Sequence, residues 1–257
     1  MTTSGGLKIL VLGGTGFVGS RFVELASRRG HEIVSVSRNA ALKSPSSSSQ
    51  SKGVKYVQGD AADASALADI INSEGAASFD ACFHSIGLLF DSESGLGSWN
   101  RLISGAGSVP RAGDTYDKVT TATAFNAIDI LNDAHSKSGG TKKIPFVFVS
   151  AAEAGWTRPA PIGWLERYLA AKRSVERRLL SGEACSLRPV ILRPGLVYDP
   201  TKPADVAKVA GSFVGYYAGL PFASKPVEVG AIAAAALRAI ADPSVLGVQT
   251  HREMERG

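Results

Sequence analysis

Cysteine is scarce in this chain of 257 residues, which contains only Cys82 and Cys185. Two cysteines are too few for a disulfide scaffold, and these two lack the spacing of metal ligands. No apolar run is long enough to span a bilayer, so we predict no transmembrane segment. The segment MTTSGG that precedes the first predicted strand is too short for a secretory signal peptide. We therefore expect neither a disulfide-rich secreted domain nor an integral membrane protein, and an organelle presequence further upstream stays open.

Nucleic-acid-binding modules are also missing, and the basic residues are scattered rather than interleaved with aromatic ones. We therefore predict no nucleic-acid partner. The net charge of +5 fits an anionic cofactor, a basic compartment such as the mitochondrial matrix, or contact with acidic lipid. Hydrophobic residues make up 44% of the chain and charged residues 20%, as in ordinary globular proteins with a substantial core. We expect a single domain over residues 1–257.

The segment KILVLGGTGFVGSRFVELASRR, residues 8–29, predicts a strand, a glycine turn and a helix. Its opening apolar run is typical of a strand buried on both faces of a parallel sheet. Glycines allow a sharp turn and a close approach to a ligand, and a helix N-terminus attracts an anion such as pyrophosphate. We predict that this turn binds a dinucleotide, and a tight turn without a ligand is the alternative. The predicted binding residues are Gly13, Thr15, Gly16, Phe17, Val18 and Gly19.

Strands and helices alternate after this turn, which predicts an α/β fold with a doubly wound parallel sheet of Rossmann type. The further predicted strands are 32–37, 54–58, 81–85 and 145–150. The predicted helices are 116–136 and 163–181, and Asp63 is the predicted N-cap of another that runs through Ile71. Polar or Gly/Ser-rich loops are expected at 43–52 and 91–114. Residues 200–257 are expected to supply a small substrate-side lobe, with helices at 205–217 and 231–241.

Ser37 and Arg38 end the second predicted strand, about 20 residues beyond the glycines, where an acidic residue would bind the ribose 2′-hydroxyl of NAD. No acidic residue is present there. A hydroxyl followed by a guanidinium suits a 2′-phosphate instead, so we predict NADP(H) in preference to NAD(H). An exposed arginine at a strand end, without a ligand, is the alternative.

The third and fourth predicted strands also end where a doubly wound sheet binds its ligand. Gly59 and Asp60 are placed to close over an adenine ring, although Asp60 equally suits a plain turn. His84 would lie near the chemistry, but a lone histidine at a strand end is more often a hydrogen-bonded structural residue.

Tyr168 and Lys172 are four residues apart in a predicted helix, so one helical face presents both side chains. A phenol ordinarily titrates near ~10. An ammonium group one turn away, together with a nicotinamide cation, would favour the phenolate, so that Tyr168 exchanges a proton with a carbonyl or carbinol. Ser150, at the end of a predicted strand, would steady the same oxygen. The alternative is a surface helix in which Tyr168 packs and Lys172 pairs with Glu176.

The motifs together resemble the short-chain dehydrogenase/reductase (SDR) superfamily, in its extended or atypical branch. They are GGTGFVG, Gly59-Asp60, Ser150, Tyr168-x-x-x-Lys172 and LRPGLVY at 192–198. HSIGLLFD at 84–91, TYDKVT at 115–120, FVSAAE at 148–153 and RPGLVYD at 193–199 are similar to atypical members linked to mitochondrial ubiquinone biosynthesis and, more distantly, to the 39 kDa subunit of respiratory complex I. The resemblance implies a mitochondrial location, on the matrix side and peripheral to the inner membrane; plastid and cytoplasm stay open.

The resemblance also implies roles for single residues. Gly13, Gly16 and Gly19 would line the pyrophosphate, Ser37 and Arg38 the adenosine phosphate, Asp60 and Ala61 the adenine, Ser85, Ile86 and Gly87 the cofactor ribose, and Pro194 and Gly195 the nicotinamide. Ser150, Tyr168 and Lys172 would take the catalytic positions, with Lys172 also holding the cofactor ribose. HSIG stands where Asn-x-Ala-Gly is usual, and WLER is an unusual lead-in to the tyrosine. These departures bear on catalysis and leave dinucleotide binding untouched.

Two classes of function follow. The first is an NADPH-dependent oxidoreductase for a hydrophobic, quinone-related carbonyl or alcohol, with Phe213, Tyr217, Leu220 and Phe222 as apolar contacts or as core. The second is a catalytically silent NADPH-binding assembly or regulatory subunit that docks to a membrane-associated protein complex. A nucleotide-sugar epimerase would share the fold, but the C-terminal lobe is small for a sugar nucleotide.

Overall fold

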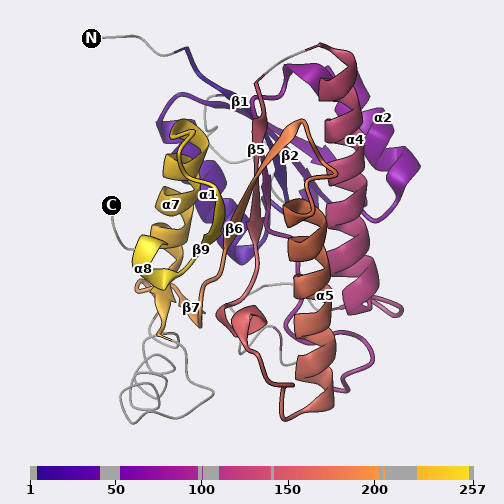
Figure 1. The fold of residues 1–257 in the computed structure, drawn as a ribbon, viewed down its shortest axis with the longest axis vertical. Coiled ribbons are helices and arrows are strands. Elements are labelled where there is room, and N and C mark those ends of the chain that lie inside the picture. The colour runs from indigo at the N-terminus through magenta and orange to yellow at the C-terminus, as the bar shows by residue number, and fades with distance from the viewer. Residues whose placement is uncertain are drawn as a thin grey trace.

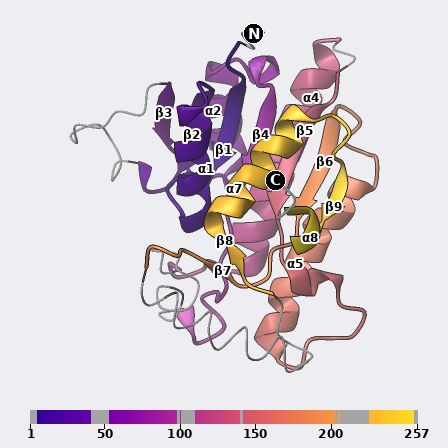
Figure 2. The same ribbon diagram turned by 90° about the vertical axis from the view of Figure 1, so that its left-hand side faces the viewer.

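A computed structural model describes residues 5–40, 53–97, 100, 110–139, 142–202, 205 and 225–254. A seven-stranded sheet in the order β3-β2-β1-β4-β5-β6-β9 runs through its centre (Figure 2). All neighbouring strands in it are parallel. Its strands are β1 (Lys8–Leu12), β2 (Glu32–Ser37), β3 (Val54–Gln58), β4 (Ala81–His84), β5 (Ile144–Val149), β6 (Leu187–Leu192) and β9 (Gly247–Gln249), and a separate pair consists of β7 (Val197–Tyr198) and β8 (Val227–Glu228).

Helices cover both faces of this sheet (Figure 1). Helices α1 and α7 pack on one face, and α2, α4 and α5 pack on the other. Their bounds are α1 (Phe17–Arg28), α2 (Ala64–Ser73), α4 (Thr123–Lys137), α5 (Gly163–Leu180) and α7 (Val229–Ala241), with a short α8 (His251–Met254). A π-helical turn, Asp117–Ala122, leads directly into α4, and 3₁₀ turns occupy Ala76–Ser78 and Ala152–Gly155.

The two faces of strand β1 explain why its sequence is a continuous apolar run. Ile9 and Val11 join the core beneath α1 and α7, whereas Leu10 and Leu12 join the core beneath α2, α4 and α5. All four side chains are fully buried. A strand covered on both faces has no solvent side to supply polar residues. The predicted doubly wound α/β fold is confirmed, and its strand order reverses between β1 and β4, the place where such sheets bind ligands.

Most predicted elements are found within a residue or two of their predicted bounds. Strands β2 and β3 match their predictions, β4 ends one residue early, and β5 is shifted by one residue towards the N-terminus. The helix predicted at 116–136 starts as a π-helical turn, and the helix predicted at 231–241 starts at Val229. Asp63 caps α2 as predicted, since its carboxylate accepts the N–H of Ala66 at 3.0 Å. No sequence pattern predicted β6 or β9.

Several predictions lie outside the described residues. They are the loop 43–52, the part of the second loop that holds Trp99 and Arg101, most of the helix 205–217, and the side chains of Phe213, Tyr217, Leu220 and Phe222. Within the described ranges, no helix combines the length and apolar character needed to cross a membrane. The same ranges contain no group of three or more potential metal ligands.

Candidate functional site

A cleft of about 930 Å³ lies at the carboxyl ends of the central strands, where the strand order reverses. Every predicted cofactor and catalytic residue except Gly19 lines it. These residues are Gly13, Thr15, Gly16, Phe17, Val18, Ser37, Arg38, Asp60, Ala61, Ser85, Ile86, Gly87, Ser150, Tyr168, Lys172, Pro194 and Gly195. Segments up to 182 positions apart, from residue 13 to residue 195, therefore meet around one space. The roles of the individual residues stay predictions.

Gly13, Gly16 and Gly19 have different structural roles in the turn. Gly13 has a φ of +89°, which L side chains rarely adopt. A Cβ on Gly19 would lie 2.2 Å from the carbonyl oxygen of Gly13, so Gly19 lets α1 pack against the turn rather than line the cleft. Gly16 is the N-cap of α1 and lines the cleft, and a Cβ there would meet only that same oxygen, at 3.2 Å. An open helix N-terminus facing a cleft fits a pyrophosphate.

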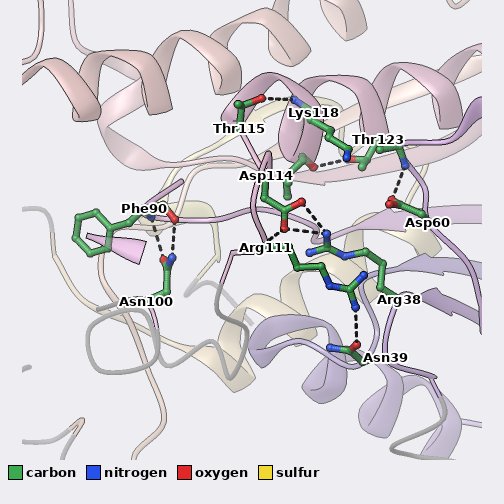
Figure 3. A network of polar contacts seen from close by, with 12 residues as sticks. Arg38, Asn39, Asp60, Phe90, Asn100, Arg111, Asp114, Thr115, Lys118 and Thr123 are labelled. Atoms are coloured by element: carbon green, nitrogen blue, oxygen red, sulfur yellow. Dashed lines mark hydrogen bonds and ion pairs between the residues drawn. The ribbon is translucent and has the colours of Figure 1, made fainter. Parts of the chain in front are cut away.

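Arg38 forms an ion pair that the sequence around it does not indicate. Its Nη1 donates to both carboxylate oxygens of Asp114, at 2.9 and 2.8 Å (Figure 3). The Asp114 side chain is almost fully buried, yet it reaches the cleft lining. Ser37 is buried too, and its hydroxyl makes no hydrogen bond to any residue the structure describes. An orphaned hydroxyl beside a guanidinium fits a polar group of a ligand, since buried polar atoms are normally paired.

Asp60 takes part in a turn, as its alternative interpretation had it. Its carboxylate accepts the N–H of Ala62 at 3.0 Å. The Asn126 side chain on α4 donates to the carbonyl oxygens of Ala61 and Ala62, at 3.0 and 3.1 Å. This bridge fixes the loop after β3 beside the cleft, and nothing in the sequence singled out Asn126. Contact of Asp60 with adenine stays a prediction.

Ser150 is hydrogen-bonded to an ion pair between the buried Glu176 and the partly buried Arg193, at the other end of the cleft. Its hydroxyl donates to Glu176 Oε1 at 2.6 Å, and Arg193 donates through Nε to the same oxygen at 3.0 Å. The suggested pairing of Glu176 with Lys172 is therefore wrong, because Lys172 Nζ instead donates to the carbonyl oxygen of Val149 at 2.8 Å. A hydroxyl has one proton, and the proton of Ser150 is engaged by Glu176. In this arrangement Ser150 offers a substrate only its lone pairs.

Tyr168 and Lys172 do share one face of α5 and the same cleft. The Tyr168 ring packs edge-to-face on Tyr116, with centroids 5.8 Å apart, and Lys172 Nζ lies 5.9 Å from the Tyr168 centroid. Burial raises the pKa of the Tyr168 phenol, and Glu153 and Tyr116 raise it further. The prediction concerned Lys172 together with a nicotinamide cation, so it stays a prediction, and Lys172 does not by itself offset the effect of burial. Lowering it would require the charge of a bound nicotinamide.

His84 is a structural residue in this fold. It is fully buried, and its Nε2 lies 3.0 Å from the hydroxyl of Thr123. Burial lowers the pKa of His84 to about 3, and the neighbouring Lys172 lowers it as well, so the ring is neutral at physiological pH. His84 does not line the cleft. The structural alternative for this histidine therefore holds.

The lowered pKa of Lys172 leads us to predict that the stability of the protein depends on pH. Burial lowers its pKa from 10.5 to about 8, although Glu176 opposes this. Below about pH 8 the folded chain bears the full cost of a buried charge, and stability rises as pH increases towards 10.5, where the unfolded chain also loses the proton. Lys172→Met should abolish this rise. The free energy of unfolding, native minus variant, should increase by up to about 3 kcal/mol between pH 7 and 10.5 in urea titrations. A difference that does not change with pH would contradict the lowered pKa.

Apolar side chains dominate the cleft beyond Tyr168. They come from the segment after β4, the segment before α5, the first turns of α5 and the segment after β6. The residues are Leu88, Leu89, Trp156, Pro161, Ile162, Leu165 and Leu196. Sequence patterns did not single out any of them as site residues, because they lie mainly in irregular segments. This end of the cleft suits a nonpolar molecule.

Comparisons with known proteins agree with this geometry. The model of the family described as NAD(P)H-binding matches residues 13–243. The chain is 26% identical to MIOREX complex component 2 of Saccharomyces cerevisiae over 214 residues, which are 75% of this chain and 73% of that protein. It is 30% identical to phenylcoumaran benzylic ether reductase 1 of Arabidopsis thaliana over 156 residues, 56% of this chain, and spans about half (47%) of that reductase.

Solved structures share the fold. ElxO with NADP bound has a TM-score of 0.68 at 14% identity, covering 95% of this chain and 96% of that one. WbmH of Bordetella bronchiseptica in complex with NAD⁺ has a TM-score of 0.62 at 18% identity, covering 96% of this chain and 76% of that one. One neighbour holds NADP and the other NAD⁺, so fold likeness alone does not decide between the two cofactors.

Proposed function

The chain belongs to the NAD(P)H-binding family, and from this premise we propose that it is an NADPH-dependent oxidoreductase of SDR type acting on a hydrophobic, quinone-related carbonyl or alcohol. The observation that carries the proposal is that Tyr168 and Lys172 line the same cleft as the glycine turn. When bound, the nicotinamide supplies or accepts a hydride. The direct test is NADPH consumption, followed by absorbance, with a panel of soluble quinones and apolar ketones.

In this proposal the residues at the reacting end have distinct tasks. The Tyr168 hydroxyl gives a proton to, or takes one from, the substrate oxygen. Lys172 holds the cofactor ribose in this proposal. The closeness of its Nζ to Gly87 supports this role, since a Cβ built on Gly87 would lie 3.2 Å from Nζ. Ser150, whose proton is donated to Glu176, accepts a hydrogen bond from the Tyr168 or substrate hydroxyl. The apolar wall from Leu88 to Leu196 binds the substrate and excludes water.

The second candidate is an NADPH-binding assembly or regulatory subunit of a mitochondrial complex, without catalysis. Two observations favour it. Ser150 cannot donate to a substrate while Glu176 holds its proton, and the Tyr168 pKa is raised in the protein alone. A relative named as a MIOREX complex component also supports a complex-bound role. Retention of NADPH binding with no turnover on any member of the substrate panel would favour this candidate.

The proposed preference for NADPH makes a specific prediction about Arg38. Arg38→Ala should weaken NADPH binding by about ten- to a hundredfold, because a charge-assisted contact to the 2′-phosphate is worth about 1.5–3 kcal/mol. NADH lacks that phosphate, so its affinity should stay within about twofold. Isothermal titration calorimetry with both nucleotides measures the two changes. An equal loss for NADPH and NADH would discard the assignment of Arg38 to the phosphate.

A further inference from the structure

A second arginine lies at the end of β2, and it comes from a distant part of the chain. Arg111 belongs to the segment between β4 and α4, 72 residues beyond Asn39. Its Nη2 nevertheless lies 3.4 Å from Asn39 Oδ1, and Asn39 follows Arg38 directly (Figure 3). Arg111 is exposed and stands at the rim, outside the residues that line the cleft. The place where a Rossmann fold distinguishes its cofactors therefore carries two guanidinium groups.

A tight turn holds Arg111 in this position. The N–H of Arg111 donates to Asp114 Oδ2 at 3.0 Å, and the N–H of Asp114 donates back to the carbonyl oxygen of Arg111 at 3.0 Å. Gly113 within the turn has a φ of +80°. The same Asp114 carboxylate binds Arg38, so one buried side chain holds the guanidinium of Arg38 and the backbone of Arg111.

Donors and charge remain available at this place. Arg38 uses only Nη1 on Asp114, and its Nε and Nη2 bind no residue in the described ranges. The Ser37 hydroxyl beside it is also unpaired there. Asp114 offsets the charge of one arginine and leaves that of the other, while Lys118 adds a further cation to the cleft lining. A phosphate monoester of charge about −1.5 to −2 matches such a group better than a neutral ribose hydroxyl does.

We propose that Arg111 is a second ligand of the 2′-phosphate of NADPH, and that Asp114 positions Arg111 and Arg38 on two sides of that phosphate. The inference rests on the proposed preference for NADPH and extends it to a residue from another loop. Cofactor choice in this chain then depends on the segment after β4 as well as on the end of β2. Arg111→Ala should weaken NADPH binding about tenfold and leave NADH within about twofold, since only one nucleotide carries the phosphate.

The test is calorimetric titration of the full chain with NADPH, NADH, 2′,5′-ADP and 5′-AMP. The last two probes isolate the adenosine half from the nicotinamide end. Arg111→Ala should weaken 2′,5′-ADP as much as NADPH, and Arg111→Lys should lie between native and alanine because it keeps the charge and loses the fork. Arg252→Ala, an exposed arginine on α8, is the matched control for the loss of one positive charge and should change none of the affinities.

Parallel titration of Arg38→Ala separates failure of this inference from failure of the proposed function. If Arg38→Ala selectively weakens NADPH while Arg111→Ala does not, the Arg111 inference is overturned and the NADPH preference stands. If the native chain binds NADPH no more tightly than NADH, the NADPH preference fails and takes the Arg111 inference with it. A selective loss in both variants, with native melting temperatures, supports the pair of ligands.

Discussion

Tyr168→Phe is expected to lower turnover about a thousandfold and to leave the affinity for NADPH within about twofold of the native value. Phenylalanine keeps the ring that packs edge-to-face on Tyr116, so the cleft retains its shape. Only the hydroxyl is lost, and with it the proton donor or acceptor at the substrate oxygen. The glycine turn and Arg38 are untouched by the change, which is why nucleotide binding should persist. Rates with the best quinone or ketone of the panel, and NADPH titration calorimetry, measure the two properties.

Tyr56→Phe is the matched control for Tyr168→Phe. Tyr56 lies on β3, outside the cleft lining, and its hydroxyl makes no hydrogen bond within the described part of the chain. The same loss of a hydroxyl there should leave turnover unchanged. Native turnover in Tyr168→Phe would remove this residue from proton transfer. If the native chain turns over nothing and Tyr168→Phe fully replaces it in cells, the subunit hypothesis accounts for the protein better than the enzyme hypothesis.

The fold was predictable where the signal is local and continuous. β1, the glycine turn and α1 lie within residues 8–28, and each has its own pattern: an apolar run, glycines, and a helical repeat. β6 and β9 gave no such signal. β6 contains Arg188 and Pro189 among its apolar residues, and β9 is only three residues long and pairs with β6. These two segments form strands because they pair with the sheet, and sequence patterns within a short segment do not reveal that pairing.

The site was predictable as a set of residues but not as a network. The three residues that the motifs singled out, Ser150, Tyr168 and Lys172, line one cleft, and their catalytic roles stay predictions. The partners that modify them are set by tertiary contacts. The alternative interpretation paired Glu176 with Lys172 because of helical spacing, yet the Glu176 carboxylate accepts hydrogen bonds from Arg193, which follows β6, and from Ser150. Asp114 and Arg38 are 76 residues apart and meet only in the folded chain. Likewise, the raised pKa of Tyr168 results from burial, which spacing cannot measure.

Gly16→Val is expected to weaken NADPH and NADH alike by about a hundredfold, or about 2.7 kcal/mol. The backbone at Gly16 has φ −75° and ψ 177°, an extended conformation open to any residue. The Cβ of the new side chain would lie 3.2 Å from the carbonyl oxygen of Gly13, so the turn has to shift by only a few tenths of an ångström. Its side chain would project from the N-terminus of α1 into the cleft, where the pyrophosphate is proposed to approach bare amides. Gly19 is unsuitable for this test, because a Cβ there would collide with backbone and disturb the fold itself.

A matched control makes the Gly16 result specific. Gly163 is the first residue of α5, lies outside the cleft lining, and has no atom within 4 Å of the position its Cβ would take. Gly163→Val should therefore leave both nucleotide affinities unchanged, although it adds the same side chain to another helix N-terminus. Calorimetry gives the affinities, and urea unfolding verifies that both variants are folded. Native affinity in a folded Gly16→Val would mean that no diphosphate lies against this turn. The roles proposed for Arg38, Arg111 and Tyr168 would then fail as well, because each role assumes a nucleotide whose pyrophosphate is bound at this turn.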